Sequence, residues 1–218
     1  MLFPELIEVL DPEPHDAALN MAIDEVLLRG ATAPLLRVYR WARPAVSFGY
    51  FGRHAEVAAA WPARELVRRW TGGGVVPHGS DVTYTLIAPR EAGEFCSLNA
   101  SDSYRAIHEC IARLLGERVT LAPAAAPKVS SACFENAAQH DVLAGGHKLA
   151  GAAQRRTRHG LLHQGSVQLS SGQDLLRERL ANAFSPGVKP RELTPDEFAA
   201  AGELAKAKYG SEGWNRRM

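Results

Sequence analysis

The stretch 68–86, RRWTGGGVVPHGSDVTYTL, combines residue types that can hold a ligand close to the main chain. A run of glycines fits a tight turn that leads into a strand. It also lets backbone amide and carbonyl groups approach a ligand with no side chain between them. The two arginines before the glycines would add cationic donors for a carboxylate, phosphate or thioester oxygen. The phosphate-binding patterns GxxxxGK[ST] and GxGxxG are both absent.

Cys133 and Lys148, fifteen residues apart (148 − 133), are two further candidates for chemistry. A cysteine thiolate is a strong nucleophile and a good leaving group, and a nearby lysine or histidine raises the thiolate fraction. A lysine ammonium can stabilise negative charge that develops on a carbonyl or phosphate oxygen. Each residue also has an ordinary structural explanation. A free cysteine is often a small buried apolar residue, and a lysine at the start of a strand is often a solvated charge.

Composition excludes several classes of protein. The 218 residues are 46% hydrophobic with a net charge of +1, which argues against an electrostatically driven nucleic-acid binder. The basic clusters 68–69 and 155–158 leave a local anionic partner open. No apolar run approaches the ~20 residues of a membrane helix, and the N-terminus does not resemble a signal peptide. Three cysteines without CxxC spacing predict neither a disulfide framework nor a metal site. We expect one cytosolic domain over residues 1–218.

The elements that must position these residues can be predicted from periodicity and turn residues. Asp16 can cap a first helix that Gly30 ends, and Gly145-Gly146 can turn one strand into the next. Cys133 falls in a loop rich in proline and alanine, and Lys148 begins the strand after that glycine turn. Helices are predicted at 16–29, 55–65, 103–115, 173–184 and 194–209, and strands at 35–41, 45–51, 82–88, 141–144, 148–155 and 161–169. This order favours one α+β domain.

Several motifs, in order along nearly the whole chain, resemble the lipoate–protein ligase A and octanoyltransferase family of the biotin/lipoate attachment superfamily. LNMAIDEVLL is similar to the N-terminal helix of this family, and LLRVYRWARPAVSFGYF to its first strand pair. RRWTGGGVVPH is close to its signature RR-x-[ST]-G-G-G-x-V-x-H. GGHKLAGAAQRRTRHGLLHQGSV resembles its lysine motif, and LAKAKYGSEGWN its last helix. The biotin-ligase pattern GRGRxG is absent.

The resemblance implies both a fold and a reaction. The implied fold is a central mixed, largely antiparallel sheet with flanking helices, the catalytic core shared with class II aminoacyl-tRNA synthetases and biotin ligases. The implied reaction joins an octanoyl or lipoyl group, through an amide bond, to one lysine of a lipoyl carrier domain. Such domains occur in 2-oxoacid dehydrogenases and in the glycine cleavage H protein.

The resemblance also implies roles for individual residues. Lys148 corresponds to the active-site lysine of the family, whose ammonium would hold the acyl carbonyl or an adenylate phosphate. The ACF context of Cys133, and its spacing from Lys148, resemble the cysteine-dependent octanoyltransferases. The acyl- and substrate-binding residues implied by the two motifs are Arg68, Arg69, Thr71, Gly72, Gly73, Gly74, His78, Gly151 and Ala152.

Two reactions fit this family. A transferase takes octanoyl from acyl carrier protein onto a cysteine and needs no cofactor. A ligase uses ATP, Mg²⁺ and lipoate and forms an acyl-adenylate. Bacterial ligases of the family commonly carry an additional C-terminal domain. The sequence stops after the last predicted helix, so we favour the transferase, although GGG is ligase-like and a separate accessory subunit could serve a ligase. An alternative of another class is a non-catalytic binder of lipoate or of lipoyl domains.

Three further groups of polar residues have no single role that the sequence determines. His163 and Gln164 are shifted relative to the family pattern, which predicts that His163 lies on the opposite face of its strand from the site. Asp141 resembles a family position near the nucleotide or the substrate, but we expect an exposed acid at the start of a strand. Arg155, Arg156 and Arg158 are expected at a solvated hairpin edge, with an acidic lipoyl domain or a carrier's phosphopantetheine as an alternative contact.

Overall fold

The computed structural model describes residues 1–126 and 137–217, so Cys133 lies outside the described residues. A large sheet contains β1 (Glu5–Leu10), β2 (Leu35–Tyr39), β6 (Val82–Pro89), β7 (Val119–Leu121), β8 (Val142–Ala144), β9 (His147–Thr157), β10 (Gly160–Val167) and β11 (Gly187–Glu192). A small sheet contains β3 (Ala45–Phe48), β4 (Glu65–Arg68) and β5 (Val75–His78). Within the described residues, the eight strands of the large sheet run in the order β11-β1-β2-β6-β10-β9-β8-β7, and the small sheet runs β4-β3-β5.

The large sheet is mixed and largely antiparallel. β1 lies parallel to both β11 and β2, and the pairs from β2 through β6, β10, β9 and β8 to β7 are antiparallel. In the small sheet, β3 is parallel to β4 and antiparallel to β5. This arrangement confirms the α+β fold predicted from the sequence.

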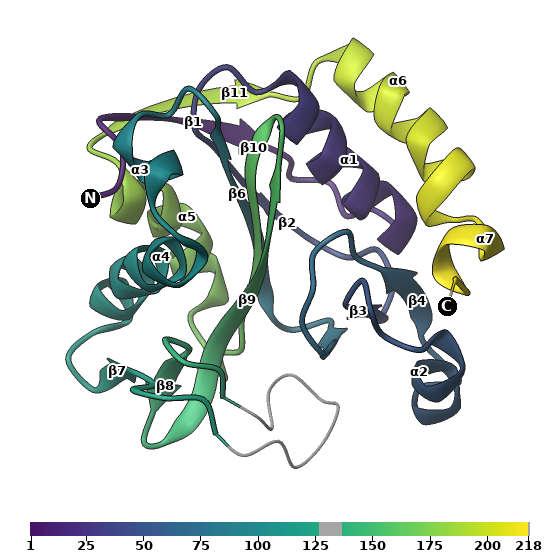
Figure 1. Cartoon of the computed structure of the whole chain (residues 1–218), viewed down its shortest axis with the longest axis horizontal. Coiled ribbons are helices and arrows are strands. Elements are labelled where there is room, and N and C mark those ends of the chain that lie inside the picture. The colour runs from purple at the N-terminus through teal and green to yellow at the C-terminus, as the bar shows by residue number, and fades with distance from the viewer. Residues whose placement is uncertain (127–136, 218) are drawn as a thin grey trace.

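Helices cover both faces of the large sheet (Figure 1). One face carries α3 (Glu94–Ser97), α4 (Ala100–Leu115) and α5 (Gln173–Phe184), and Ile107, Ile111 and Phe184 are buried there. The other face carries α1 (Ala17–Gly30), α6 (Pro195–Leu204) and the π-helical turn η1 (Ala205–Tyr209), with Ile23 and Leu27 buried between them. Two short helices, α2 (His54–Ala60) and α7 (Glu212–Asn215), lie beside the small sheet.

Local sequence explains several element boundaries. The Asp16 side chain accepts a hydrogen bond from the Leu19 amide at 2.8 Å and caps α1, as predicted. Thr194 and Glu197 form a capping box at the start of α6. The helix expected over 55–65 is wrong at its C-terminal end, because it stops at Ala60 and Glu65–Arg68 pairs with β3 as a strand.

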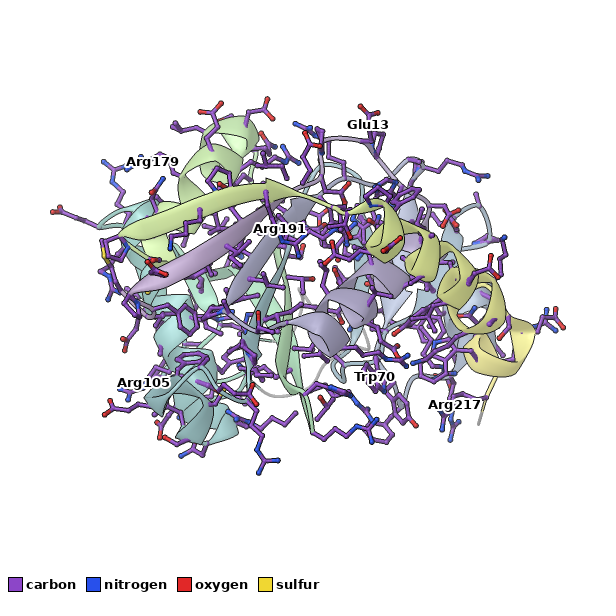
Figure 2. The ribbon with its side chains drawn as sticks, turned by 90° about the horizontal axis from the view of Figure 1, so that it is seen from above. Glu13, Trp70, Arg105, Arg179, Arg191 and Arg217 are labelled. Atoms are coloured by element: carbon purple, nitrogen blue, oxygen red, sulfur yellow. The ribbon has the colours of Figure 1, made fainter. Side chains whose placement is uncertain are left out.

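Several charged side chains lie at the periphery of the molecule when it is seen from above (Figure 2). In Figure 2, Arg105 on α4 and Arg179 on α5 lie toward one side of the molecule, while Trp70 and Arg217 lie toward the other. Among residues 1–126 and 137–217, no helix combines the length and the apolar character needed to cross a membrane.

Candidate active site

A pocket opens where the large sheet faces the small sheet. Its empty space amounts to roughly 390 Å³, part of it open to solvent, and its exposed lining is mostly apolar. The lining includes predicted site residues from both motifs together with side chains from β2, β3, β6 and β10. These residues are Met21, Tyr39, Trp41, Ser47, Arg69, Gly73, Val76, His78, Thr83, Gly151, Ala152, Ala153, Gln164, Gly165 and Ser166. A narrow apolar pocket with a few polar groups is the usual form of a small-molecule site.

The glycine stretch packs directly on the end of β3. A Cβ atom added at Gly49 would overlap the Gly73 carbonyl oxygen and lie 2.7 Å from the Gly72 carbonyl carbon. Gly73 also has a φ of +85°, a backbone conformation that favours glycine. A Cβ at Gly72, by contrast, would meet no atom within 4 Å. Internal packing therefore explains the glycine at 49 and backbone conformation the glycine at 73, whereas Gly72 borders open space.

The two arginines before the glycines lie in different environments. Arg68 is buried, and its five guanidinium N–H groups donate to the backbone carbonyls of Tyr50, Gly52, Trp214, Asn215 and Arg217 at 2.6–3.1 Å. It does not line the pocket, and it ties α7 to β4 instead. Since these carbonyls already satisfy every donor of its guanidinium, we do not retain Arg68 as a substrate contact.

Arg69 is buried at the wall of the pocket. Its NH1 group donates to the Ser47 hydroxyl at 2.7 Å, and its NH2 group donates to the carbonyls of Gly72 and Gly74 at 3.0 and 2.9 Å. Thr71, which is fully buried, donates to the Gln164 side chain at 2.8 Å and so links the glycine stretch to β10. These contacts fix the guanidinium plane of Arg69 against the glycine stretch.

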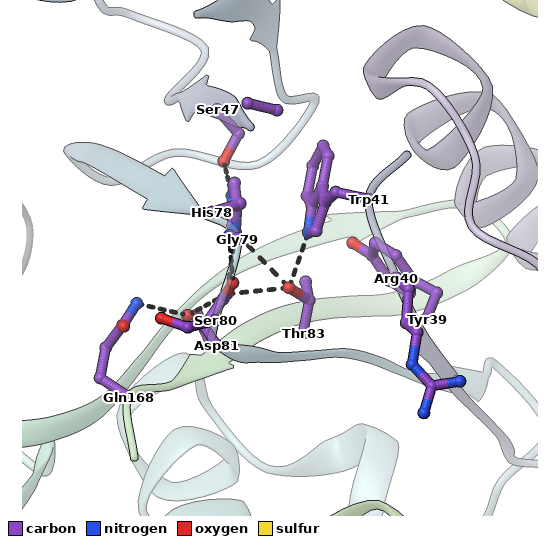
Figure 3. Close-up of polar contacts among 12 residues, drawn as sticks. Tyr39, Arg40, Trp41, Ser47, His78, Gly79, Ser80, Asp81, Thr83 and Gln168 are labelled. Carbon is purple, nitrogen blue, oxygen red and sulfur yellow. Dashed lines mark hydrogen bonds and ion pairs between the residues drawn. The ribbon is translucent and has the colours of Figure 1, made fainter. Parts of the chain in front are cut away.

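His78 belongs to a buried polar network at the pocket wall (Figure 3). Its Nε2 lies 2.6 Å from the Ser47 hydroxyl, and its Nδ1 lies 2.8 Å from the Asp81 carboxylate. Its ring stacks on Trp41, with centroids 4.1 Å apart and planes 16° apart. Burial alone would raise the pKa of Asp81, but the adjacent His78 and the hydrogen bonds from His78, Ser166 and Gly79 lower it to about 2. Asp81 and Ser47 were not predicted from the sequence.

Lys148 is held at the edge of the same pocket. Its ammonium lies 2.7 Å from Asp141, and the two side chains are 3% and 0% exposed. A Cβ added at Gly151, which lines the pocket, would overlap the Lys148 side chain and lie 3.1 Å from Asp141. The expectation that Asp141 is exposed is therefore wrong, because β9 and α4 cover it.

Tyr104 on α4 completes the surroundings of Asp141. Its hydroxyl donates to the carboxylate at 2.5 Å and accepts a hydrogen bond from the Ala152 amide at 2.9 Å. Burial, followed by the nearby Asp141 charge, raises the pKa of Tyr104 well above its ordinary value. Tyr104 thus remains a hydrogen-bond donor, and it connects Asp141 to the strand that lines the pocket.

The remaining polar residues of β9 and β10 lie in different environments. His163 is fully buried, contacts Tyr84 and Gln154 at 3.0 and 3.1 Å, and does not line the pocket, whereas its neighbour Gln164 does. This confirms the predicted face of the strand. Arg155 is not the solvated residue that we expected, because it donates to the Trp70 carbonyl and stacks on the Trp70 and Tyr50 rings. Arg156 and Arg158 are exposed, as expected.

Cys133 lies outside the described residues, but the structure describes both flanks of its segment. The Ala126 amide donates to the Ala137 carbonyl at 2.7 Å, so the two flanking positions lie side by side. The Ala138 amide donates to Asp141, the partner of Lys148, at 2.6 Å. Among the described residues, no group of three or more His, Cys, Asp or Glu side chains is arranged to hold a metal ion.

Comparisons with known proteins agree on one family. The family model of the lipoyl protein ligase A/B catalytic domain matches residues 16–194. A protein of Oceanobacillus iheyensis named octanoyltransferase LipM is 37% identical over 179 residues, covering 77% of this chain and 65% of the relative. Octanoyltransferase LipM of Kyrpidia tusciae is 30% identical over 267 aligned positions, covering 92% of this chain and 95% of the relative.

Solved structures show the same fold at lower sequence identity. Lipoate-protein ligase A bound with ATP matches with a TM-score of 0.74 and 22% identity, covering 97% of this chain and 98% of that chain. The bipartite lipoate protein ligase of Thermoplasma acidophilum matches with a TM-score of 0.68 and 21% identity, covering 99% and 97%. These likenesses concern the fold.

Proposed function

The chain belongs to the lipoyl protein ligase A/B catalytic domain family, and within it we propose that the protein is an octanoyltransferase that modifies lipoyl domains. The observation that carries this proposal is the similarity to octanoyltransferase LipM over almost the full length of the Kyrpidia tusciae relative. In the proposed reaction, an octanoyl group passes from acyl carrier protein to one lysine of a lipoyl domain or of the glycine cleavage H protein.

The pocket suits the acyl chain. Its mostly apolar lining would bury the hydrocarbon, which favours binding by removing apolar surface from water. Arg69 at its wall and Lys148 at its edge supply the cationic groups that a thioester carbonyl needs as it becomes an oxyanion. The acyl carbonyl would therefore lie between the glycine stretch and Gly151.

Cys133 is the proposed acyl acceptor. Its thiolate attacks the carbonyl of the octanoyl thioester, and the thiol of the carrier leaves. The amine of the target lysine then attacks the new thioester, loses a proton, and releases the Cys133 thiolate as the amide forms. Because the donor is already an activated thioester, this route needs no cofactor.

The competing reaction is ATP-dependent lipoate ligation, which the ligase-like run Gly72–Gly74 favours. It would require ATP, Mg²⁺ and lipoate. It would proceed through lipoyl-AMP, and a separate subunit could assist it. It makes no use of Cys133, so the two reactions predict different covalent states of the protein.

Intact-mass spectrometry after incubation with octanoyl-acyl carrier protein distinguishes them. We expect an added octanoyl group that hydroxylamine removes, that is lost in Cys133→Ala, and that is retained in Cys110→Ala, a matched variant of a buried cysteine. The transferase proposal is wrong if no adduct forms and ATP, Mg²⁺ and lipoate allow Cys133→Ala to modify a lipoyl domain. No modification under either condition would point to a non-catalytic binder.

A further inference from the structure

Three side chains, one from β3 and two from the end of β5 and the turn after it, form a continuous hydrogen-bonded chain that ends at Arg69. Asp81 contacts His78, His78 contacts Ser47, and Ser47 contacts Arg69, at 2.8, 2.6 and 2.7 Å. Figure 3 shows the first three side chains stacked between the small sheet and β6, with Trp41 alongside. All four side chains are at least 94% buried, from 1% exposed at Ser47 to 6% at Arg69.

The direction of each hydrogen bond follows from the Asp81 carboxylate. Its Oδ2 accepts hydrogen bonds from the hydroxyls of Thr83 and Ser166 at 2.8 and 2.6 Å, and its Oδ1 accepts one from the Gly79 amide at 3.1 Å. An ionised carboxylate can only accept. The Nδ1 atom of His78 must therefore carry a proton and donate it to Asp81.

The remaining directions are then determined. In the neutral imidazole, Nε2 has a lone pair and accepts the single hydroxyl proton of Ser47. The Ser47 oxygen is left to accept the hydrogen bond from the Arg69 guanidinium, which can only donate. A doubly protonated His78 would instead donate to Ser47, and the Ser47 proton would lose this acceptor. The neutral Nδ1–H tautomer satisfies every group in the chain.

Trp41 holds this arrangement in place. Its ring stacks on His78, and its indole N–H donates to the Thr83 hydroxyl at 2.8 Å, so the Thr83 proton is free to reach Asp81. Trp41 therefore orients the His78 ring by stacking on it. Through Thr83, Trp41 also orients a hydrogen bond to Asp81, the acceptor that fixes the His78 tautomer.

We propose that Asp81, His78 and Ser47 are positioning residues that orient the Arg69 guanidinium at the wall of the acyl pocket. This inference rests on the proposed function, in which Arg69 faces the acyl carbonyl. With NH1 held by Ser47, NH2 points to the Gly72 and Gly74 carbonyls, and the guanidinium cannot rotate away from the glycine stretch. We name this set, Asp81, His78 and Ser47, the Arg69 relay.

The Arg69 relay has the same order of hydrogen-bonded groups, Asp–His–Ser, as a serine-hydrolase triad, but its serine has a different role. In such a triad, the serine oxygen is free to attack a carbonyl. Here the Ser47 oxygen accepts a hydrogen bond from a guanidinium, which stabilises its lone pair and lowers its nucleophilicity. The relay therefore acts on the orientation of Arg69, and Ser47 does not become acylated.

The first test reads the tautomer directly, without any substrate. Long-range ¹H–¹⁵N correlation spectra of the folded protein should show His78 protonated at Nδ1 and bare at Nε2. In Asp81→Asn the amide can donate to Nδ1, so His78 should switch to the Nε2–H tautomer. An Nε2–H tautomer in the unsubstituted protein would overturn the proposal, whatever the outcome of octanoyl-transfer assays.

The second test measures octanoyl transfer by the relay variants. We expect Ser47→Ala, His78→Asn and Asp81→Asn each to lower kcat by about 10- to 100-fold while KM changes less than about threefold, because a misplaced Arg69 weakens transition-state contacts. Ser47→Thr, which keeps the hydroxyl, should retain most of the activity. The double variant Ser47→Ala/His78→Asn should lose no more than the worse single variant, since both break the same chain.

Matched variants separate positioning from general destabilisation. Ser185→Ala removes another fully buried serine, and His15→Asn breaks another His–Asp contact, at 2.7 Å, away from the pocket. Both should leave kcat unchanged. Additive losses in the Ser47→Ala/His78→Asn double variant, or labelling of Ser47 by a fluorophosphonate, would overturn the proposal. Labelling would identify Ser47 as a nucleophile.

Discussion

The Lys148 ammonium lies 2.7 Å from the Asp141 carboxylate, and both groups are almost completely removed from solvent. Asp141 thereby compensates a charge that would be costly to bury alone. It also draws the Lys148 side chain across Gly151, in the wall of the pocket. The position of the proposed active-site lysine therefore depends on one carboxylate and one glycine.

Gly151→Ala should impair catalysis more than it impairs folding. The added Cβ would overlap the flexible end of Lys148, which can move, so we expect a stability loss of less than about 2 kcal/mol. Displacing the ammonium should lower kcat by about 100-fold, because transition-state contacts tolerate little misplacement. Steady-state octanoyl transfer and urea unfolding would measure the two effects.

A glycine elsewhere provides the control for this substitution. A Cβ at Gly202, in α6, would meet no atom within 4 Å, so Gly202→Ala should leave kcat unchanged and stabilise the helix by up to about 1 kcal/mol. Full activity in Gly151→Ala would mean that the position of the Lys148 ammonium does not matter for transfer.

Asp141→Asn should destabilise the protein strongly. Removing one partner of a buried ion pair leaves a buried charge uncompensated and costs about 3–5 kcal/mol, which for a chain of this size lowers the melting temperature by about 10 °C. Differential scanning calorimetry would measure the shift. Asp174→Asn, whose carboxylate is 80% exposed although it contacts two arginines, should change stability by less than about 0.5 kcal/mol. Equal melting temperatures for the two variants would contradict the structural role assigned to Asp141.

Alanine should lower stability at Gly49 but weaken substrate binding at Gly72. Alanine at Gly49 would push the backbone of the glycine stretch away, so we expect a loss of about 1–3 kcal/mol in unfolding free energy. Alanine at Gly72 has space, so stability should persist while KM for the octanoyl donor rises. Urea unfolding and steady-state kinetics would separate these effects. An unchanged KM in Gly72→Ala would show that no ligand lies against that glycine.

The sequence predicted the elements whose signals are local. The helix predicted at 173–184 is confirmed as α5, because its periodicity and flanking residues are contained within the element. The edge strand β11 and its neighbour β1 were not predicted. β11 reads GVKPRE, with no apolar alternation, and it forms a strand only because Glu5–Leu10 pairs with it from the other end of the chain. Pairing between such distant segments leaves no periodic pattern.

The same limit applies to the site. The glycine stretch, His78 and Lys148 were recognised because they lie in contiguous motifs. Ser47 and Asp81 were not, since a polar residue in a short strand or turn has no sequence feature that reveals its partner in space. Asp141 was predicted as exposed because two elements outside its own segment bury it. Tyr104 on α4 comes from far earlier in the sequence, and Lys148 on β9 comes from a later strand.

The last prediction concerns acid stability and rests on His108. This residue is fully buried beside Tyr104, and its Nδ1 contacts the His140 carbonyl at 2.7 Å. Among the described residues its Nε2 has no hydrogen-bond partner. Burial lowers the pKa of His108 from its ordinary value of 6.5 to about 4, although the His140 carbonyl and the Asp141 charge oppose the shift.

The sign of the effect follows from proton uptake. Above pH 6.5 both the folded and the unfolded chains carry a neutral His108, so the residue contributes no pH dependence. Between pH 6.5 and about 4 the unfolded chain binds a proton that the folded protein does not, so stability falls as the pH falls. From pH 7 to pH 5, His108 should contribute a loss of about 2 kcal/mol in the free energy of unfolding.

Urea unfolding at these two pH values would measure the loss. His108→Gln keeps a donor for the His140 carbonyl but does not titrate, so the difference between the two pH values should shrink by about 2 kcal/mol. His147→Gln, at an exposed position on β9, should leave that difference unchanged. If His108→Gln and His147→Gln lose the same stability between pH 7 and pH 5, His108 takes up its proton in the folded state as readily as in the unfolded chain. The inference that His108 is a neutral imidazole in the folded protein at pH 5 would then be wrong.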